Sequence, residues 1–421
     1  MAAKLMDVID DLSLLSVQPI EPPISDLTID IIQAEILPKL PYKSLMRFKA
    51  VCKSFNVLIS SREFIRLHLR HSLSSDNRLL VTKGSVCTMD IYDLHSHSSA
   101  PSITFCWPSG SPFVVGSCNG LLLIVVDPYI NNLLPLVLLN PTTRTYIEFQ
   151  STDTNVVRGN IGFGYDDSND DYKIVVVSDK HNTFGSWRVT SIYSVNLKSW
   201  RVVDQLFTSD FMEEPYSWFN GLLINNHLLH WIFLNQSEHK RSIGCFNVIS
   251  EKWGEDLHFP YYYYYDCNST GYFLDVGVLN NSLFTSFVDT VNSFFDLWIM
   301  KEYGVNESWI KMLRFNIGDD PNGGVVPINK PFNESLLRMA GFLTLIEVPG
   351  GVIPVTYRGK GRSEVLLRRR RDSYTLFCYD WMNNAIVKSE IPNVYGRRPY
   401  FVRESLVRLP GAKLFGPLYQ P

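Results

Sequence analysis

Two regions of the chain differ in the spacing of their hydrophobic residues. Between residues 26 and 71, apolar side chains recur every three or four positions, the spacing that lines one face of a helix. After about residue 78 this period ends, and short runs of Val, Ile, Leu and aromatic residues alternate with Gly, Asn, Asp and Pro, as in strands and turns. The pattern predicts an α+β multidomain chain, with a small all-helical module followed by an all-β domain.

The helical region divides at its prolines. A first helix is expected to begin near Asp26 and to end at Pro38 and Pro41, because proline cannot continue a helix. A second helix is expected to carry a narrow apolar stripe made of Leu45, Phe48, Cys52 and Phe55. Further short helical turns follow up to residue 71. Residues 1–23, acidic and then proline-bearing, are expected to form a flexible lead-in.

The β region contains a repeat. A turn followed by a strand that begins with an aromatic residue recurs at Tyr146, Trp200, Trp253 and Trp309, at intervals of 54, 53 and 56 residues. A period of about 50 residues is the spacing of kelch-like propellers, in which each repeat forms one four-stranded blade. We therefore predict a β-propeller of about six blades over residues 79–410, with blades that begin near residues 79, 112, 161, 219, 272 and 338.

One strand is left over at the C-terminal end, around residues 400–408. A propeller whose last strand pairs with its first or last blade leaves no exposed edge. We expect this strand to close the ring in that way.

Composition narrows the class of protein. The formal net charge is −3 and 45% of the residues are hydrophobic, so the chain is globular and no overall field predicts binding to nucleic acid or to a membrane surface. Seven scattered cysteines indicate reduced thiols and a cytosolic or nuclear location. Acidic residues interrupt the N-terminal apolar run, so no signal peptide is expected, and no later run is long enough to span a bilayer.

No pattern predicts a catalytic site or a cofactor. Residues 116–120 match a nucleophile elbow with Cys118 in place of Ser, but a strand rather than a helix follows, which favours a tight blade turn. The zinc-ligand candidates lack the usual spacing, and we interpret them as part of a polar loop: Cys87, His95, His97 and Cys106. The acidic cluster after Gly164 lacks the remaining positions of a calcium loop and is interpreted as a solvated turn: Asp166, Asp167, Asp170 and Asp171.

Several motifs resemble those of a known family. Residues 26–69 resemble the F-box through Ile36-Leu37, Leu40-Pro41, Lys43-Ser44-Leu45, Arg47-Phe48-Lys49, Val51-Cys52-Lys53-Ser54-Phe55 and Leu58-Ile59-Ser60. Residues 116–408 resemble the F-box-associated domain of plant proteins through GSCNGLL from Gly116, LLNPTTR from Leu138, GFGYDDSNDDYK from Gly162 and LWIMKEYGVNESWIK from Leu297. The chain is therefore similar to the substrate receptors of plant SCF-type ubiquitin ligases.

This resemblance implies a non-catalytic receptor whose F-box docks on a Skp-type adaptor, itself tied to a cullin and a RING protein, and whose propeller binds a protein target. Between Lys39 and His71 the only acid among eight basic residues is Glu63, so an acidic partner suits the module. An apolar helical surface with basic flanks can bury a few anchors against such a partner. The expected adaptor contacts are Leu40, Pro41, Leu45, Phe48, Val51, Cys52 and Phe55.

The chain departs from the usual F-box pattern at three places. Gln33 and Ala34 stand before Glu35 where one residue is usual, and an extra residue turns an α-helix by about 100°. Thr28 replaces the usual proline at the helix start, and Phe55 replaces the usual tryptophan.

Five consecutive tyrosines lie in the connection between two predicted blades: Tyr261, Tyr262, Tyr263, Tyr264 and Tyr265. Tyrosines supply rigid amphipathic contacts, so the run is the expected target-binding patch, while burial in a strand is the alternative. Two other functions stay open. One is a propeller scaffold that no longer assembles into a ligase, and the other is a propeller enzyme with ligands in its central channel.

Overall fold

The computed structural model divides the chain into two compact units, Met1–His71 and Ser72–Pro421. It describes residues 31–72, 78–83, 88–93, 103–107, 112–126, 135–150, 160–182, 185–207, 211–212, 221–235, 240–260, 272–279, 282–289, 294–316, 353–358, 364–369, 375–380, 385–391 and 395–415.

The first unit is helical. Its elements are a π-type turn η1 (Ile32–Ile36), a 3-10 turn η2 (Leu37–Lys39) and the helices α3 (Tyr42–Val51), α4 (Lys53–Ser60) and α5 (Arg62–Ser72). The prediction of one helix through Cys52 and Phe55 is wrong. Cys52 is extended (φ −155°, ψ 163°) between α3 and α4, and its Sγ accepts a hydrogen bond from the Phe55 N–H at 3.5 Å. A side-chain acceptor at this position satisfies an N–H group that the helix leaves unpaired, and so starts a new helix.

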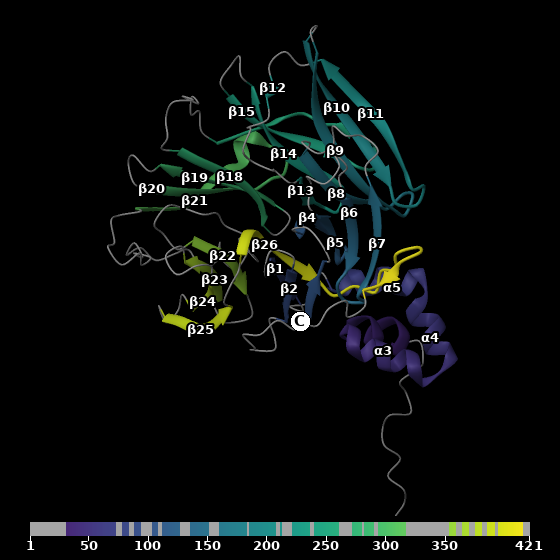
Figure 1. Cartoon of the computed structure of the whole chain (residues 1–421). Coiled ribbons are helices and arrows are strands. Elements are labelled where there is room, and N and C mark those ends of the chain that lie inside the picture. The colour runs from purple at the N-terminus through teal and green to yellow at the C-terminus, as the bar shows by residue number, and fades with distance from the viewer. Residues whose placement is uncertain are drawn as a thin grey trace, which may run out of the picture. The chain divides into compact units, whose positions relative to one another are not determined.

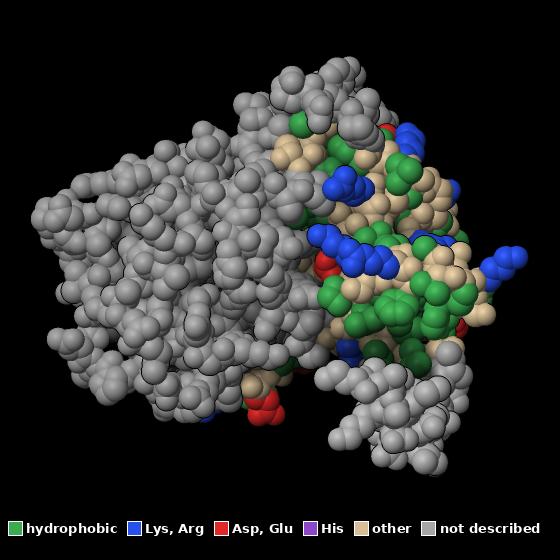
Figure 2. Space-filling view, turned by 90° about the horizontal axis from the view of Figure 1, so that it is seen from below, with side chains coloured by type: hydrophobic (Ala, Val, Ile, Leu, Met, Phe, Trp, Pro, Cys, Tyr) green, Lys and Arg blue, Asp and Glu red, His purple; other side chains and the backbone are tan. Residues whose placement is uncertain are grey.

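The helical unit has a small core of its own. Leu37 and Leu45 are completely buried, Ile59 is 1% exposed, and Phe64 and His68 are each 3% exposed. On the surface of the molecule seen from below, hydrophobic side chains gather with Lys and Arg side chains around them (Figure 2). The unit therefore combines a buried apolar face with apolar residues that it leaves exposed to solvent.

Within the described residues, the second unit contains six antiparallel sheets, which Figure 1 shows set around a common centre. We number them as blades 1 to 6. Blade 1 contains β26 (Tyr395–Arg403), β1 (Arg78–Lys83), β2 (Thr88–Asp93) and β3 (Ile103–Cys106), and blade 2 contains β4 (Pro112–Cys118), β5 (Leu121–Val126), β6 (Pro135–Asn140), β7 (Thr145–Gln150) and β27 (Lys413–Leu414). Blade 3 contains β8 (Asn160–Asp166), β9 (Asp171–Asn182), β10 (Gly185–Ser194) and β11 (Ser199–Phe207).

The remaining blades follow in chain order. Blade 4 contains β12 (Phe211–Met212), β13 (Leu222–Ile224), β14 (Leu228–Asn235), β15 (Lys240–Asn247), β16 (Lys252–Trp253) and β17 (Leu257–His258). Blade 5 contains β18 (Tyr272–Leu279), β19 (Ser282–Asp289), β20 (Phe294–Met300) and β21 (Trp309–Asn316), with the turn η4 (Asn306–Ser308) before β21. Blade 6 contains β22 (Ile353–Arg358), β23 (Glu364–Arg369), β24 (Thr375–Asp380) and β25 (Ala385–Ile391). The predicted fold class, a helical module followed by a propeller, is confirmed.

The repeat seen in the sequence marks the outer strand of successive blades. Tyr146, Trp200 and Trp309 lie at the start of β7, β11 and β21, and Trp253 ends the two-residue strand β16. Two of these rings reach back to the preceding blade. The indole N–H of Trp253 donates to Thr190 Oγ1 at 3.0 Å, and that of Trp309 donates to the His258 carbonyl at 2.9 Å. At Trp253 and Trp309 the aromatic residue therefore fills and hydrogen-bonds the seam between neighbouring blades.

The turns before these strands repeat as well. At Asn140, and again at Asn247, the side-chain oxygen accepts hydrogen bonds from the backbone N–H groups two and three residues ahead, at 2.8 to 3.2 Å. The residue four ahead then has positive φ, 54° at Arg144 and 56° at Glu251. Asn forms such turns readily because its short side chain mimics a backbone acceptor.

The C-terminal segment closes the propeller twice. β26 pairs with β1, as expected for the leftover strand. The chain then crosses the turns of blade 2 so closely that a Cβ atom added at Gly120 (φ +78°) would lie 2.3 Å from Ser405 Cβ, too close for any side chain. Beyond this crossing, β27 pairs with β7 of blade 2. The Phe415 ring packs in edge contact with Phe105 of blade 1 and Tyr146 of blade 2, at 4.7 and 5.1 Å between centroids.

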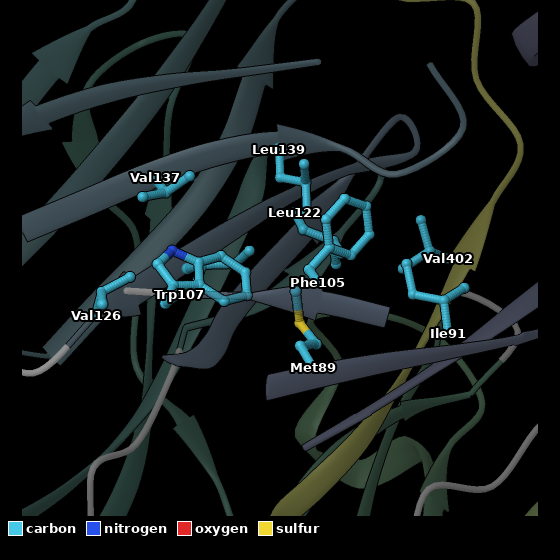
Figure 3. Close-up of a cluster of buried hydrophobic side chains, with 10 residues drawn as sticks. Met89, Ile91, Phe105, Trp107, Leu122, Val126, Val137, Leu139 and Val402 are labelled. Carbon is cyan, nitrogen blue, oxygen red and sulfur yellow. The ribbon is translucent and has the colours of Figure 1, made fainter. Parts of the chain in front are cut away.

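The propeller core lies between neighbouring blades. Figure 3 shows the cluster between blades 1 and 2, where Phe105 and Trp107 meet side chains of β2, β5, β6 and β26. Similar clusters lie between blades 3 and 4, around Trp231, and between blades 4 and 5, around Trp309. In these three places neighbouring blades stabilise one another through a shared apolar cluster.

Candidate functional site

The turn at Leu40 and Pro41 lies between η2 and α3, and the helical unit holds it rigidly. Leu40 is half-buried and Pro41 is exposed at the start of α3. The Nε2 atom of the buried His68 lies 3.2 Å from the Leu40 carbonyl oxygen. Burial lowers the pKa of His68, so the ring is neutral at pH 7 and Nε2–H donates this bond. The turn expected to contact the adaptor is therefore fixed by α5 before any partner arrives.

The other expected contacts fall into two groups. Val51 is 68% exposed, and Cys52 is exposed beside it. Phe48 and Phe55 are half-buried and pack edge-to-face, with ring centroids 5.8 Å apart. Leu45 was expected to contact the adaptor, but its side chain is completely buried. In a module this small, the predicted apolar stripe also has to supply the core.

Three exposed apolar residues were not among the expected contacts. Val57 is 71% exposed, Ile31 45% and Ile36 40%. Of the nine exposed large hydrophobic residues in the described chain, four lie within 31–72: these three and Val51. Exposed apolar residues concentrated in so short a stretch are typical of a protein-binding surface. Helical spacing predicts the stripe but does not tell which apolar residues outside it are exposed, so only the structure identifies these three.

Basic side chains are exposed on the same helices as Val51 and Val57. Lys43, Arg47 and Lys53 are exposed on α3 and α4. Lys39 is also exposed and pairs with Glu35 at 2.9 Å one helical turn earlier. The predicted basic character of the unit is thus carried by side chains that a partner can reach.

The motif that resembled a nucleophile elbow is a hairpin turn. β4 ends at Cys118, and Asn119 and Gly120 turn the chain into β5 with positive φ values of 51° and 78°. Cys118 is 3% exposed, and burial raises the pKa of its thiol. The predicted tight turn is confirmed, and the thiol is neither accessible nor ionised.

The acidic cluster forms a turn, but the prediction that it is solvated is wrong for two of its members. Asp166 is completely buried and Asp171 is 5% exposed. The Lys173 ammonium donates to Asp166 Oδ2 and to Glu251 Oε1 of blade 4, both at 2.7 Å. Burial alone would raise the pKa of Asp166, but hydrogen bonds from Lys173 and Asn169 outweigh it and hold the pKa below its usual value. These charges join blades 3 and 4.

A second buried polar group joins blades 4 and 5. His230 is completely buried, with Nε2 2.7 Å from the Tyr303 hydroxyl and Nδ1 3.2 Å from the Leu222 carbonyl, and Cys245 Sγ lies 3.1 Å from the same hydroxyl. Burial lowers the pKa of His230 to about 4 and raises the pKa of Cys245 and of Tyr303. All three groups are neutral at pH 7, so they position the β20–β21 turn and supply no charged nucleophile or base.

The expected target-binding run at Tyr261–Tyr265 lies outside the described residues, as do Cys87, His95 and His97 of the zinc candidates. In the part of the chain that is described, no group of three His, Cys, Asp or Glu side chains could hold a metal ion. Within the same part, no helix is long and apolar enough to cross a bilayer.

Comparison with known proteins identifies both units. Residues 24–67 match the F-box domain, and residues 78–335, more than half of the chain, match the F-box associated beta propeller domain. The chain belongs to this F-box family. F-box proteins are generally substrate receptors rather than catalysts, and this domain pair is that of a substrate adaptor of the ubiquitin-ligase type.

Among its relatives, this F-box protein is 31% identical to the F-box/kelch-repeat protein At3g23880 of Arabidopsis thaliana, over 66% of this chain and 77% of the relative. It is 27% identical to the F-box protein CPR1 of the same plant, over 66% and 70%. Among solved structures, the β-propeller domain of the Trilobed protease from Pyrococcus furiosus is 11% identical, with a TM-score of 0.36 over 73% of this chain and 96% of that domain.

Proposed function

We propose that this F-box protein is the substrate-recognition subunit of an SCF-type ubiquitin ligase. In this role the helical unit docks on a Skp-type adaptor, which is joined to a cullin and a RING protein, and the propeller holds a protein target for ubiquitination. The role is non-catalytic and needs no cofactor. The observation that carries the proposal is an F-box with exposed apolar residues on the same chain as a propeller.

The adaptor contact is supported by the construction of the helical unit. The Leu40–Pro41 turn is held by His68, exposed Val51 lies at the end of α3, and basic side chains are exposed on α3 and α4. Rigid apolar anchors lose little conformational entropy on binding, and a few of them carry most of the binding energy of an interface. An adaptor with an acidic rim around an apolar groove fits this surface.

The target contact is assigned to connections between blades. Propeller strands form a rigid scaffold, and binding residues concentrate on the connections that such a scaffold positions. The connection from β17 to β18 contains the Tyr261–Tyr265 run, the densest group of aromatic residues in the chain. Tyrosine contributes large rigid contact area at low entropic cost.

Affinity capture from plant cells with the proteasome blocked tests the proposal. The full chain should recover a Skp-type adaptor, a cullin and a RING protein, together with candidate targets. A chain without residues 26–69 should lose the ligase subunits while candidate targets accumulate on it. Recovery of no adaptor by the full chain, or equal recovery by both chains, would contradict the assignment.

A further inference from the structure

The C-terminal segment docks on blade 2 as a short added strand. In β27, Lys413 and Leu414 pair with the start of β7 and extend the sheet by two residues. The Phe415 ring then packs on Tyr146, with 5.1 Å between ring centroids, and Lys413 Nζ lies 3.4 Å from Glu148 Oε2. An outer strand presents a row of N–H and C=O groups with which an extended segment can pair. Blade 2 therefore shows how this propeller holds such a segment.

Blade 3 repeats the construction of that edge 54 residues later. Arg144 and Lys198 both have positive φ, 54° and 51°, in the turn before the outer strand. Tyr146 and Trp200 are the second residues of β7 and β11. Within the described residues, β11 pairs only with β10. The edge that β27 covers on blade 2 is thus uncovered on blade 3.

Aromatic rings line the uncovered edge as they line the covered one. Trp200 packs on Tyr193 at 5.2 Å between centroids, and Tyr193 stacks on Phe149 of blade 2 at 4.6 Å. Trp200 and Phe149 are both half-buried. At the seam between blades 1 and 2, Phe415 packs on the corresponding rings, one from the outer strand of each blade. The seam between blades 2 and 3 leaves such ring surface open to an aromatic side chain from a partner.

Two differences between the edges define a different occupant. Val202 stands where β7 has Glu148, and it is 52% exposed. Arg201 stands where β7 has Ile147, and it is exposed. Side chains alternate along a strand, so Val202 lies on the side of Trp200 and Arg201 on the other side. The edge of blade 3 is therefore apolar where that of blade 2 is acidic, and basic where that of blade 2 is apolar.

We propose that the outer edge of β11, over residues 198–202, binds an extended segment of a protein partner that carries an apolar, an acidic and an aromatic residue in that order. In the register of β27, the aromatic residue packs on Trp200 and the apolar residue lies beside Val202. The inference deepens the proposed function and rests on it in one respect, namely that the segment belongs to the target.

Charge complementarity selects the acidic residue at the middle position. This position is that of Leu414, which is 76% exposed on blade 2, and on blade 3 it lies on the side of Arg201. The Arg201 guanidinium pairs with Glu251 of blade 4, but it has five N–H donors and can bind a second carboxylate. Lys198 is exposed in the adjoining turn and adds a further positive charge.

Binding of the purified full-length chain to immobilised hexapeptides tests the site. The probe Gly-Ala-Val-Asp-Phe-Gly carries the proposed pattern. The comparison peptide Gly-Ala-Lys-Leu-Phe-Gly is residues 411–416 of this chain, which suit the edge of blade 2. The probe should bind about tenfold more tightly than the comparison peptide, because it replaces a lysine beside Val202 with an apolar residue and adds a carboxylate beside Arg201.

A specificity switch tests the register. Val202→Glu gives β11 the carboxylate that Glu148 gives β7, so the variant should bind the probe about tenfold more weakly and Gly-Ala-Lys-Asp-Phe-Gly about tenfold more tightly than the unaltered chain does. Because Val202 is exposed, the melting temperature should not change. Val305→Glu, the same substitution at a 36% exposed valine of blade 5, is the matched control and should leave binding of both peptides unchanged.

The outcomes separate this inference from the proposed function. No binding of the probe, equal binding of probe and comparison peptide, or an unchanged preference in Val202→Glu overturns the site. If the same chain still binds a Skp-type adaptor, the receptor role stands without it. Binding of the probe with the predicted switch, by a chain that binds no adaptor, supports the site and removes the receptor role.

Discussion

Asn140 offers a direct test of how the C-terminal segment closes the propeller. The side chain is completely buried, and its Nδ2 donates to the carbonyls of Ser405 and Val407 at 3.1 and 2.8 Å. Its Oδ1 accepts from the N–H groups of Thr142 and Thr143 at 2.9 and 3.2 Å. These are all four hydrogen bonds that an amide side chain can make.

Asn140→Ala should destabilise the propeller strongly. The substitution leaves the carbonyls of Ser405 and Val407 without these donors, and both residues are buried. A buried group without a hydrogen-bond partner costs about 1–3 kcal/mol, so the two carbonyls predict a loss of about 2–6 kcal/mol in the free energy of unfolding. This is a large fraction of the total stability of most folded domains.

Asn247 provides a matched control. Its Oδ1 accepts the same pair of backbone bonds, from Ile249 and Ser250, but in a half-exposed turn where water can replace the lost acceptor. Asn247→Ala should therefore cost about 1 kcal/mol. Urea unfolding followed by tryptophan fluorescence gives both values, and limited proteolysis reports release of residues 404–415. Equal losses for the two variants, with no faster cleavage of that segment, would refute a closing role for Asn140.

Three further predictions concern the propeller. Lys173→Met should lower the free energy of unfolding by about 3–5 kcal/mol, because it leaves a buried carboxylate unpaired, and an unchanged urea midpoint would show that the ion pair is dispensable. Burial holds the pKa of His230 at about 4, below the value of about 6.5 in the unfolded chain. The stability that His230 contributes is therefore complete above pH 6.5 and is lost as the pH falls towards 4, by about 3 kcal/mol in total. His230→Gln should flatten that part of the pH–stability curve, and an unaltered curve would contradict the assignment. Replacement of three tyrosines within Tyr261–Tyr265 by serine should weaken target capture and spare adaptor binding, whereas unfolding of the propeller would mean that the run belongs to its core.

The blade pattern is readable from the sequence because its determinants are local. A turn built on Asn140 or Asn247 needs a short side-chain acceptor, and the outer strand that follows needs an aromatic residue such as Trp253 to fill the seam. Both requirements fall within a few adjacent positions, so they leave a period in the sequence. The pairing of β26 was predictable for a different reason, because a closed ring leaves a leftover strand only the first or the last blade to join, and β26 pairs with β1 of the first blade.

Features that depend on distant contacts were not predictable. The two-residue strand β27 carries no signal that directs it to β7, some 265 residues away in sequence. Helical spacing identified an apolar stripe through Leu45, but the period does not tell whether a residue faces the core or a partner. The break at Cys52 contains neither proline nor glycine, and the π turn at Ile32–Ile36 is closed by the N–H of Leu37, whose burial belongs to the tertiary structure.

Direct titration of a purified plant Skp-type adaptor into the unaltered chain and into a Leu40→Ala, Pro41→Ala double variant tests the receptor role most directly. The unaltered chain should bind, and the double variant should bind about a hundredfold more weakly, since two anchors are removed at roughly 1.4 kcal/mol per tenfold. Circular dichroism should show the helical unit still folded in the variant. An adaptor that fails to bind the unaltered chain, or that binds the folded double variant equally well, would contradict the account.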